Sequence, residues 1–432
     1  MPERQVLRVG VAGLGTVGAA TVDLIRRKGE LLASRTGHRI EVTAVSARDR
    51  SRDRGCDLSG CRWHEDAREL VADDTVDLVV ELIGGSDGIA LDVCRSALAA
   101  GKPLVTANKA LLAHHGLEMA ALAEEKGVHL GFEAAVAGGI PIVKSLREGL
   151  AANGIDKVQG ILNGTCNYIL SAMRESGRDF QEVLDEAQAL GYAEADPSFD
   201  VDGIDAAHKL ALLASLAYGG QPHFEAIHIE GIRHVSALDI SFADELGYRI
   251  KLLGIARMTA DGLEQRLHPC MVPKDAPIAQ VEGVLNAVEV TGDDVDAVMH
   301  EGRGAGGGPT ASAVVADIVD IARGVRLPVF GVPAERLADH PVAPMSKHRG
   351  CYYIRLMVLD RPGVLADVAA VLRDHDISIE ALIQRGRNPG QQVPIVFTSH
   401  EAGEAAMVGA LEAIGRLEAV IETPRMIRIE LT

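Results

Sequence analysis

The sequence predicts an α/β protein with a doubly wound parallel sheet at the N terminus, an α+β middle part and a C-terminal ferredoxin-like unit. Apolar strand patterns alternate with helix patterns over residues 6–132, as is typical of a parallel sheet covered by helices. A glycine-rich turn lies between the first strand and the first helix. Residues 352–431 show the order strand, helix, strand, strand, helix, strand, which is the ferredoxin-like pattern.

The first sheet is predicted from short apolar runs separated by helix-length segments. We expect strands at 6–12, 40–46, 76–82, 103–106 and 128–132, and helices at 16–32, at 89–100 and between the last two strands.

After Gly138-Gly139 helical patterns dominate, which indicates a change of architecture. We expect helices at 141–149, 168–175, 180–190 and 204–218, and strands at 226–232 and 263–272. A glycine-rich segment at 301–310 then opens a helix at 311–323, with Pro309 suited to a first helical turn. This Ala/Val-rich helix is expected to pack back on the first sheet.

Composition narrows the possible partners. The chain has 432 residues and a formal net charge of -18, which argues against nucleic acid or an anionic membrane as the main partner. No apolar run approaches the ~18 residues of a membrane helix, and no signal peptide is visible. The cysteines are scattered and favour free thiols in a cytoplasmic protein; Cys56 and Cys61 near His64 match no common zinc spacing.

The turn Gly13-Leu14-Gly15-Thr16-Val17-Gly18 follows a strand and opens a helix, the context of a dinucleotide-binding Rossmann fold. Gly13 permits the tight turn, Gly15 lets the backbone approach a pyrophosphate, and Gly18 lets the helix pack on the strand. The N–H groups at the helix N terminus favour the anion.

The second strand ends in Arg48, Asp49 and Arg50, where many NAD enzymes carry an acidic residue. Both arginines are placed to meet a 2′-phosphate, so we predict NADP, with NAD possible through Asp49; a solvated charged loop is the alternative. Lys109 follows a strand directly, where catalytic and cofactor-binding groups of open parallel sheets lie.

Residues 191–209 place several carboxylates just before a lysine. Asp205 and Lys209 are four residues apart on a predicted helix, so they share a face. A cationic substrate group and a lysine would offset the acidic loop, and an acid–base pair suits proton transfer to a small amine-bearing substrate. Asp196, before a proline, suits a turn, and Asp202 suits the N-cap of the helix.

Several motifs together resemble homoserine dehydrogenase of the bacterial form with a C-terminal ACT domain. The matching segments run along the whole chain in the family's order: Gly13 to Gly18, 81–85, 106–113, 163–170, 191–209, 304–306 and 310–314. The resemblance implies NAD(P)H-dependent reduction of L-aspartate 4-semialdehyde to L-homoserine, in the biosynthesis of threonine, methionine and isoleucine.

The resemblance also implies residue roles. Lys209 resembles the proton donor, Lys109 the second active-site lysine, and Asp205 and Glu194 substrate ligands with Asp200 nearby. Tyr192 is grouped with the substrate-binding residues, and the N–H groups around Gly164 and Thr165 are candidates to bind the substrate carboxylate. Gly191 and Gly306 resemble backbone contacts to the cofactor. The family's sodium site, one carboxylate plus backbone carbonyls, corresponds to Glu133, Val136, Gly138 and Ile140.

The C-terminal unit resembles an ACT domain through the turn 360–365. Such units commonly pair across a dimer and bind amino acids at that turn. We therefore expect a homodimer or homotetramer in which L-threonine binds at the turn and inhibits; a dimerisation module without a ligand is the alternative. The expected domains are a Rossmann domain at 1–139 completed by 300–332, a catalytic and dimerisation domain at 140–299, a linker at 333–349 and the ACT domain at 350–432.

Other functions remain possible from the sequence. An aspartate-semialdehyde dehydrogenase would need a nucleophilic cysteine, for which Cys166 is the candidate, and an ACT-bearing phosphoglycerate dehydrogenase would use a histidine. A non-catalytic amino-acid or redox sensor would be expected to lack Lys209 or the glycines. His114, His115 and His208 are read as structural or surface residues.

Overall fold

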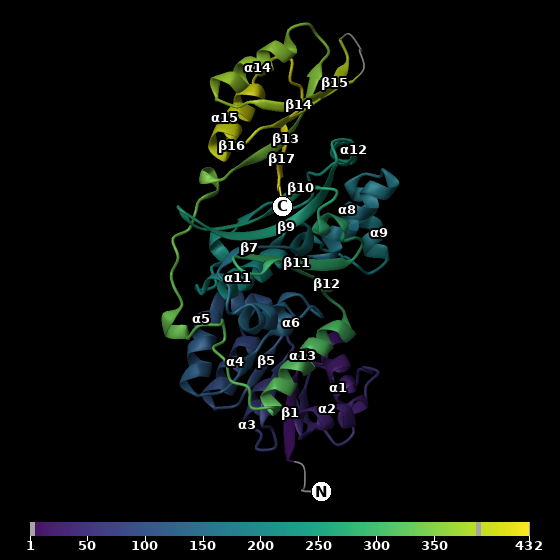
Figure 1. Cartoon of the computed structure of the whole chain (residues 1–432). Coiled ribbons are helices and arrows are strands. Elements are labelled where there is room, and N and C mark those ends of the chain that lie inside the picture. The colour runs from purple at the N-terminus through teal and green to yellow at the C-terminus, as the bar shows by residue number, and fades with distance from the viewer. Residues whose placement is uncertain (1–4, 386–389, 432) are drawn as a thin grey trace.

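The computed structural model describes residues 5–385 and 390–431, which form an elongated molecule (Figure 1). The N-terminal part lies at one end, the middle part at the centre and the C-terminal unit at the other end. The linker before the C-terminal unit runs along one side of the molecule and contains the short 3-10 helices η4 (Ala334–Arg336) and η5 (Met345–Lys347).

The N-terminal part contains a parallel sheet with the strand order β3-β2-β1-β4-β5-β6. This is the order of a doubly wound dinucleotide-binding fold, so the predicted fold class is confirmed. Only β3, a short strand, is absent from the strands predicted for this sheet. The strands are β1 (Val6–Ala12), β2 (Arg39–Ser46), β3 (Arg62–His64), β4 (Leu78–Glu81), β5 (Leu104–Thr106) and β6 (Leu130–Gly131).

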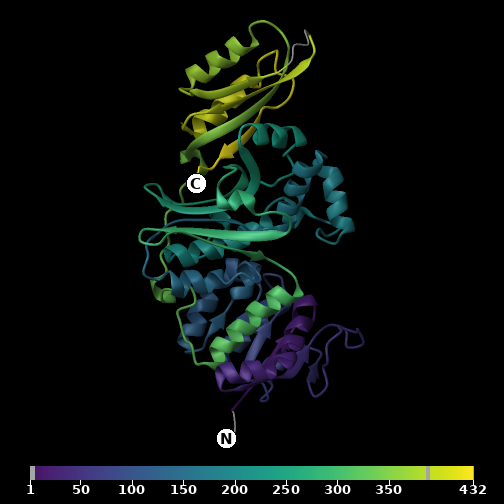
Figure 2. The same ribbon diagram turned by 45° about the vertical axis from the view of Figure 1, so that its right-hand side comes forward.

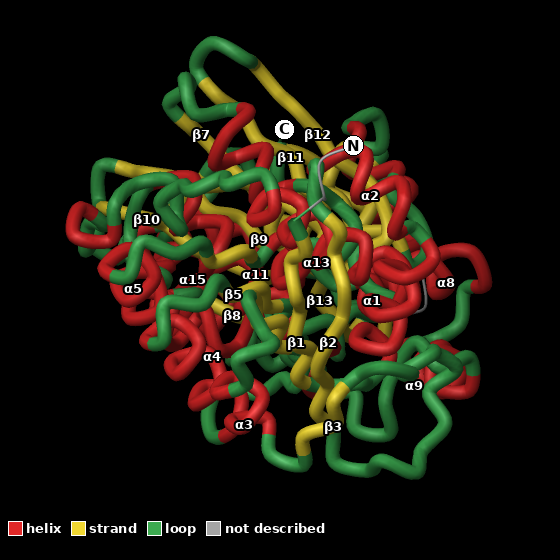
Figure 3. Tube along the Cα trace, turned by 90° about the horizontal axis from the view of Figure 1, so that it is seen from below, coloured by secondary structure: helices red, strands yellow, loops and turns green. Residues whose placement is uncertain are grey.

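Helices cover this sheet. The predicted helix at 16–32 is interrupted: α1 ends at Arg27, and α2 begins at Gly29. The late helix α13 packs beside α1 (Figures 2 and 3), and its Val314 and Ile318 share a core with Val9 of β1, as predicted. The helices are α1 (Thr16–Arg27), α2 (Gly29–Thr36), α3 (Ala67–Ala72), α4 (Ile89–Ala99), α5 (Lys109–Glu125), α6 (Glu133–Val136) and α13 (Gly307–Ala322).

The middle part is built on an antiparallel sheet with the order β12-β11-β7-β9-β10. Of these strands only β10 was predicted, and the predicted strand at 226–232 shrinks to β8. The strands are β7 (Ile155–Ile161), β8 (His228–Ile229), β9 (Tyr248–Thr259), β10 (Gly262–Pro273), β11 (Leu285–Gly292) and β12 (Asp296–Arg303).

The helices of the middle part agree with the four predicted segments, and the structure adds several short ones. They are α7 (Ile142–Lys144), the π-helix η1 (Ser145–Gly149), α8 (Gly164–Ser176), α9 (Phe180–Ala189), α10 (Ser198–Val201), α11 (Ile204–Tyr218), η2 (Phe224–Ala226), α12 (Ala237–Glu245) and η3 (Pro277–Gln280).

The C-terminal unit has the predicted βαββαβ order, with the short β16 (Ala402–Gly403) added. Its other elements are β13 (Arg349–Leu359), α14 (Val364–Asp374), β14 (Ile379–Gln384), β15 (Gln392–Ser399), α15 (Glu404–Ile414) and β17 (Arg425–Ile429).

The last strand joins the C-terminal unit to the middle part. β17 pairs antiparallel with β13 and parallel with β10, with Cys270 opposite Arg428. The middle sheet therefore continues into the sheet of the C-terminal unit, a connection that the sequence does not predict.

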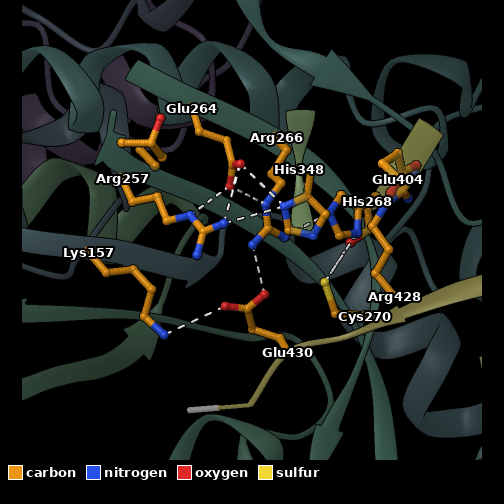
Figure 4. Close-up of polar contacts among 12 residues, drawn as sticks. Lys157, Arg257, Glu264, Arg266, His268, Cys270, His348, Glu404, Arg428 and Glu430 are labelled. Carbon is orange, nitrogen blue, oxygen red and sulfur yellow. Dashed lines mark hydrogen bonds and ion pairs between the residues drawn. The ribbon is translucent and has the colours of Figure 1, made fainter. Parts of the chain in front are cut away.

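Buried ion pairs surround this junction (Figure 4). Arg266 of β10 is 1% exposed and lies between Glu264, at 2.9 Å, and Glu430, at 2.8 Å. Arg428 of β17 binds Glu404 of α15 at 2.5 Å and Glu230 of the middle part at 2.9 Å. Buried charges of this kind are tolerated because each one is paired.

Among the described residues, none of the helices combines the length and the apolar character that crossing a membrane requires.

Candidate active site

A cavity of about 580 Å³ opens where the N-terminal and middle parts meet. The glycine turn contributes Val17, and α5 contributes Lys109. The middle part supplies Asn163 to Thr165, 191–194, Asp200, Asp205 and Lys209, and the segment before α13 supplies 303–306. All of the predicted substrate-binding and catalytic residues thus line one space. Of the predicted cofactor residues, Val17, Lys109, Gly191 and Gly306 line it, whereas Gly13 to Thr16, Gly18, Arg48 and Arg50 do not.

The glycine turn has the geometry that a dinucleotide requires. Gly13 has φ +98°, and a Cβ on it would lie 2.4 Å from the Leu82 carbonyl oxygen. A Cβ on Gly18 would lie 1.9 Å from the Gly13 carbonyl oxygen. At Gly15, by contrast, no heavy atom of the described residues lies within 4 Å of such a Cβ. The turn is therefore closed toward the protein and open on the side where a pyrophosphate would approach.

The arginine-rich loop after β2 is held by an arginine that the prediction did not single out. Arg54 donates to the Leu14 carbonyl at 3.2 Å, and its guanidinium lies 5.3 Å from the centre of the Trp63 ring. Arg50 lies 6.0 Å from the same ring. Hydrogen bonds from Ser51 lower the pKa of Asp49, so this carboxylate is already engaged within the loop.

Two lysines from different helices meet at one carboxylate. Lys209 Nζ lies 2.6 Å from Asp205 Oδ2, and Lys109 Nζ lies 3.1 Å from Asp205 Oδ1. Lys209 also donates to the Leu162 carbonyl at 2.7 Å. Lys109 begins α5 beside its N-cap Asn108, and Asp205 and Lys209 share a face of α11 as predicted.

Burial and charge act in opposite directions in this cluster. Burial alone would raise the pKa of Asp205, but Lys209 and Lys109 outweigh it and hold that pKa well below its usual range. Burial lowers the pKa of Lys209; Asp205 raises it and Lys109 lowers it. Burial also raises the pKa of Asp200, against the hydrogen bond from Asn163. The site therefore combines an ionised carboxylate with a lysine that releases its proton more readily than usual.

Asn163, between β7 and α8, was not among the predicted site residues. Its amide nitrogen donates to Asp200 at 2.8 Å and to Asp205 at 2.8 Å. The carbonyl oxygen of its side chain accepts from Cys166 N at 2.8 Å and so caps α8. The sequence signal was available: an asparagine followed by glycine and a helical pattern is a typical N-cap.

The loop at 191–196 forms one rim of the cavity. Thr165 Oγ1 donates to the Tyr192 carbonyl at 2.7 Å, and Gln188 holds the Glu194 carbonyl at 2.8 Å. Glu194 itself is exposed at the rim. Gly191 and Gly306, predicted as cofactor contacts, both have positive φ and line the cavity.

Two predicted roles for acidic residues have different outcomes. Asp196 accepts from Ser198 N at 3.1 Å, so its place in a turn is confirmed. The N-cap prediction for Asp202 is wrong: Gly203, with φ +90°, caps α11, and Asp202 pairs instead with Arg233 at 2.5 Å. A Cβ at position 203 would lie 2.7 Å from Leu267, which explains the glycine.

The four residues predicted to bind sodium lie around α6. Glu133 is 2% exposed, and its carboxylate oxygens accept from Val143 N at 2.8 Å and Lys144 N at 3.0 Å. Burial and the nearby Asp317 raise the pKa of Glu133 to about 7. No cluster of three or more acidic, His or Cys ligands occurs in the described part of the chain. The predicted donors, one carboxylate and three backbone carbonyls, are the hard oxygen ligands that such a cation takes. The Glu133 oxygens and the Ile140 carbonyl each already accept one backbone hydrogen bond, the last from Ile142 N at 2.9 Å.

Cys166 and His208, which the sequence raised as candidates or left as structural residues, are both buried. The Cys166 thiol is buried and donates to the Asp200 carbonyl at 3.3 Å, and burial raises its pKa well above the usual value. A buried protonated thiol does not suit the nucleophile of an aspartate-semialdehyde dehydrogenase. His208 stacks on Phe224 at 4.4 Å, and burial lowers its pKa to about 4.

Family models match nearly all of this architecture. The description "Homoserine dehydrogenase, NAD binding domain" matches residues 13–133, "Homoserine dehydrogenase" matches 141–319 and "ACT domain" matches 352–419.

Individual relatives agree with these matches. The chain is 47% identical over 431 residues to a homoserine dehydrogenase of Pseudomonas aeruginosa, covering 98% of this chain and 99% of that protein. The crystal structure of a homoserine dehydrogenase from Thiobacillus denitrificans superposes with a TM-score of 0.93 at 46% identity, covering 99% of this chain and 98% of that one. A hyperthermophilic archaeal homoserine dehydrogenase in complex with NADPH has a TM-score of 0.64 at 27% identity and covers 74% of this chain and 99% of its own.

Proposed function

This chain belongs to the homoserine dehydrogenase family of oxidoreductases, and on that premise we propose that it reversibly reduces L-aspartate 4-semialdehyde to L-homoserine with NADPH or NADH. The pathway we propose is the biosynthesis of threonine, methionine and isoleucine in the cytoplasm. The observation that carries the proposal is the meeting of Lys109, Asp205 and Lys209 in a cavity that the glycine turn also lines.

The nicotinamide cofactor, when bound, supplies or accepts the hydride. Negative charge then grows on the aldehyde oxygen, and Lys209 donates the proton that neutralises it. Asp205 keeps Lys209 oriented, because its carboxylate lies 2.6 Å from the lysine nitrogen. A positioned acid of this kind contributes roughly 10²–10⁴-fold to the rate. Lys109, which lies 3.1 Å from the other oxygen of Asp205 and lines the cavity, would add a second positive charge near the developing oxyanion.

The charges of the cavity support an orientation for the substrate. Glu194 and Asp200 would supply negative charge for its ammonium group, and Tyr192 lines the same cavity. The N–H groups of Gly164 and Thr165, at the start of α8, are the donors for its carboxylate. Asp205 orients the lysines more than it binds substrate, since both of its oxygens already have partners.

For the cofactor we propose a preference for NADP over NAD. Gly13 to Gly18 would receive the pyrophosphate, Gly191 and Gly306 would contact the cofactor through their backbones, and Arg48 and Arg50 would meet the 2′-phosphate. The archaeal relative in complex with NADPH supports this choice. Steady-state kinetics with NADPH and NADH test it, and equal kcat/KM values for the two would contradict it.

We also propose that sodium binds at Glu133, Val136, Gly138 and Ile140. Gly138 packs against the segment 303–306, which lines the cavity, since a Cβ on Gly138 would lie 2.3 Å from the Gly304 carbonyl oxygen. A cation there would order the segment that contacts the cofactor. NaCl should therefore raise activity above that in choline chloride at equal ionic strength.

The C-terminal unit suggests regulation. We propose that L-threonine binds at the turn 360–365, where Gly363 has φ +98°, and that the protein forms a homodimer or homotetramer through this unit or the middle part. If millimolar L-threonine causes neither a thermal shift nor inhibition, the effector proposal is wrong.

The proposed domain boundaries are 1–139 with 300–332 for the nucleotide domain, 140–299 for the catalytic domain, 333–349 for the linker and 350–432 for the ACT domain.

The decisive assay is reduction of NADP+ with L-homoserine, set against L-malate and 3-phosphoglycerate. We expect turnover with L-homoserine and not with L-malate or 3-phosphoglycerate. Turnover with 3-phosphoglycerate instead would favour a phosphoglycerate dehydrogenase, and binding without turnover would favour a sensor.

A further inference from the structure

We propose that Asn163 is a positioning residue that bridges the carboxylates of Asp200 and Asp205 and keeps Asp200 ionised. The role presupposes the proposed oxidation of L-homoserine, because it matters only where an ammonium-bearing substrate must meet Asp200 while Asp205 orients Lys209.

The side-chain amide of Asn163 is fully occupied. Its nitrogen donates one hydrogen to Asp200 Oδ1 and one to Asp205 Oδ2, each at 2.8 Å, and its oxygen accepts from Cys166 N at 2.8 Å. Ionised carboxylates only accept and the backbone N–H only donates, so the orientation of the amide is fixed. With both hydrogens committed and the residue 5% exposed, Asn163 acts on the substrate only through its neighbours.

The carboxylates come from different helices, Asp200 from α10 and Asp205 from α11. Asp205 has two lysine partners, whereas the side-chain contact of Asp200 is Asn163. Burial and the charge of Asp205 raise the pKa of Asp200, and the hydrogen bond from Asn163 opposes them. The titratable and charged groups that face the pair are Lys109 of α5, Lys209 and His208 of α11, Cys166 of α8 and the nearby Asp202.

Loss of the Asn163 amide therefore acts first on Asp200. Without that donor the Asp200 carboxyl protonates at higher pH, and a neutral carboxyl no longer attracts the substrate ammonium. Asp205 is less affected because the two lysines remain. The expected defect is thus weaker substrate binding toward acid pH, with turnover recovering where Asp200 is ionised.

Asn163→Ser separates this role from helix capping. Serine is as good an N-cap as asparagine, so α8 keeps its cap. The shorter side chain lacks the NH₂ group that donates to both Asp200 and Asp205. We would measure kcat and KM for L-homoserine from about pH 5 to about pH 10 at saturating NADP+. The acid limb of kcat/KM should move to higher pH by about one unit, so KM should rise by up to about tenfold on the acid side and return toward the wild-type value where Asp200 is ionised.

A matched control comes from another helix. Asp66 caps α3 through Arg68 N at 2.9 Å and does not line the cavity, so Asp66→Ser should keep the wild-type pH profile. If the acid limb of Asn163→Ser coincides with the wild type, Asn163 is a helix cap only and the positioning role is wrong. If the wild type itself does not oxidise L-homoserine, the proposed function fails, and the two failures are distinguishable.

Asn163→Asp provides the second test and serves alone if the serine variant does not fold. Aspartate keeps the shape and the cap but replaces the donor with a third carboxylate. The acid limb should then move further in the same direction, because the added charge disfavours ionisation of Asp200. An unchanged limb, or one moved to lower pH, would overturn the proposal.

Discussion

Lys209 and Lys109 approach opposite oxygens of Asp205, but their surroundings differ. The Lys209 side chain is 10% exposed and fixed by two acceptors, whereas the Lys109 side chain, which lines the cavity, is 30% exposed. The buried lysine is better suited to deliver a proton to one defined point, because burial lowers its pKa and its partners fix its direction.

Lys209→Ala should lower kcat for L-homoserine oxidation by roughly 10²–10⁴-fold and leave NADPH binding largely intact. The measurements are steady-state kinetics and cofactor titration. Lys251→Met is a matched control, since Lys251 is also buried, with a pKa lowered by burial to about 8, but does not line the cavity. That control should reduce stability while keeping kcat; near-normal turnover of Lys209→Ala would refute the proton-donor role.

Glu133 predicts a pH effect on stability. Burial and Asp317 raise its pKa from 4.5 to about 7, so the folded protein holds a proton that the unfolded chain releases. The protonated Glu133 carboxyl therefore contributes stability in full below about pH 4.5, and this contribution to the unfolding free energy is lost as pH rises toward 7. Glu133→Gln should flatten the fall in unfolding free energy between these values, as measured by denaturant titration; an unchanged slope would show that other groups cause it.

The positions of the site residues were predictable to different degrees. The pairing of Lys209 with Asp205 was predictable because their spacing puts them on one helix face. Asn163 was not singled out, since its two carboxylate contacts depend on α10 and α11 arriving from nearly forty residues away. Asp202 was misplaced because residue type alone favours an N-cap, whereas the close packing of Gly203 on Leu267 decides the position.

The glycine turn makes an element-scale prediction that separates folding from cofactor binding. Gly15 has φ −74° and an open side, so Gly15→Ala should fold normally but obstruct the pyrophosphate. In Gly18→Ala the new Cβ would lie 1.9 Å from a backbone oxygen, so α1 must shift. Thermal unfolding without cofactor should fall only in Gly18→Ala, while NADPH affinity should fall in both. Wild-type NADPH affinity in Gly15→Ala would place the pyrophosphate elsewhere.

The strands show what local sequence can reveal. The first sheet was predicted because its strands are buried on both faces and read as short apolar runs. Strands β7 and β11 were missed because they carry polar residues that pair with each other across the sheet. Gln159 of β7 donates to Glu289 of β11 at 2.6 Å, although both are buried. Such residues appear as loop in a sequence, since their partners are distant along the chain.

At the scale of the whole molecule, β17 makes the C-terminal unit part of the middle sheet. It hydrogen-bonds to β10, and its Arg428 binds one glutamate on each side of the junction. A signal from the turn 360–365 would therefore have a continuous sheet through which to reach the middle part. The archaeal relative that covers 74% of this chain shows that the family also has shorter members.

Arg428→Met tests this coupling. The substitution would leave the buried Glu404 without its arginine, and breaking a buried pair of this kind costs about 3–5 kcal/mol. Because β17 and β10 share hydrogen bonds, native-state hydrogen exchange should show their amides opening together in the wild type and both becoming less protected in the variant. Arg416→Met is the control: Arg416, just after the end of α15, pairs with the exposed Glu412, so its loss should change stability by at most about 0.5 kcal/mol. If β10 keeps its protection while β17 loses it, the two parts open independently, and the continuous sheet is not the route by which an effector would act.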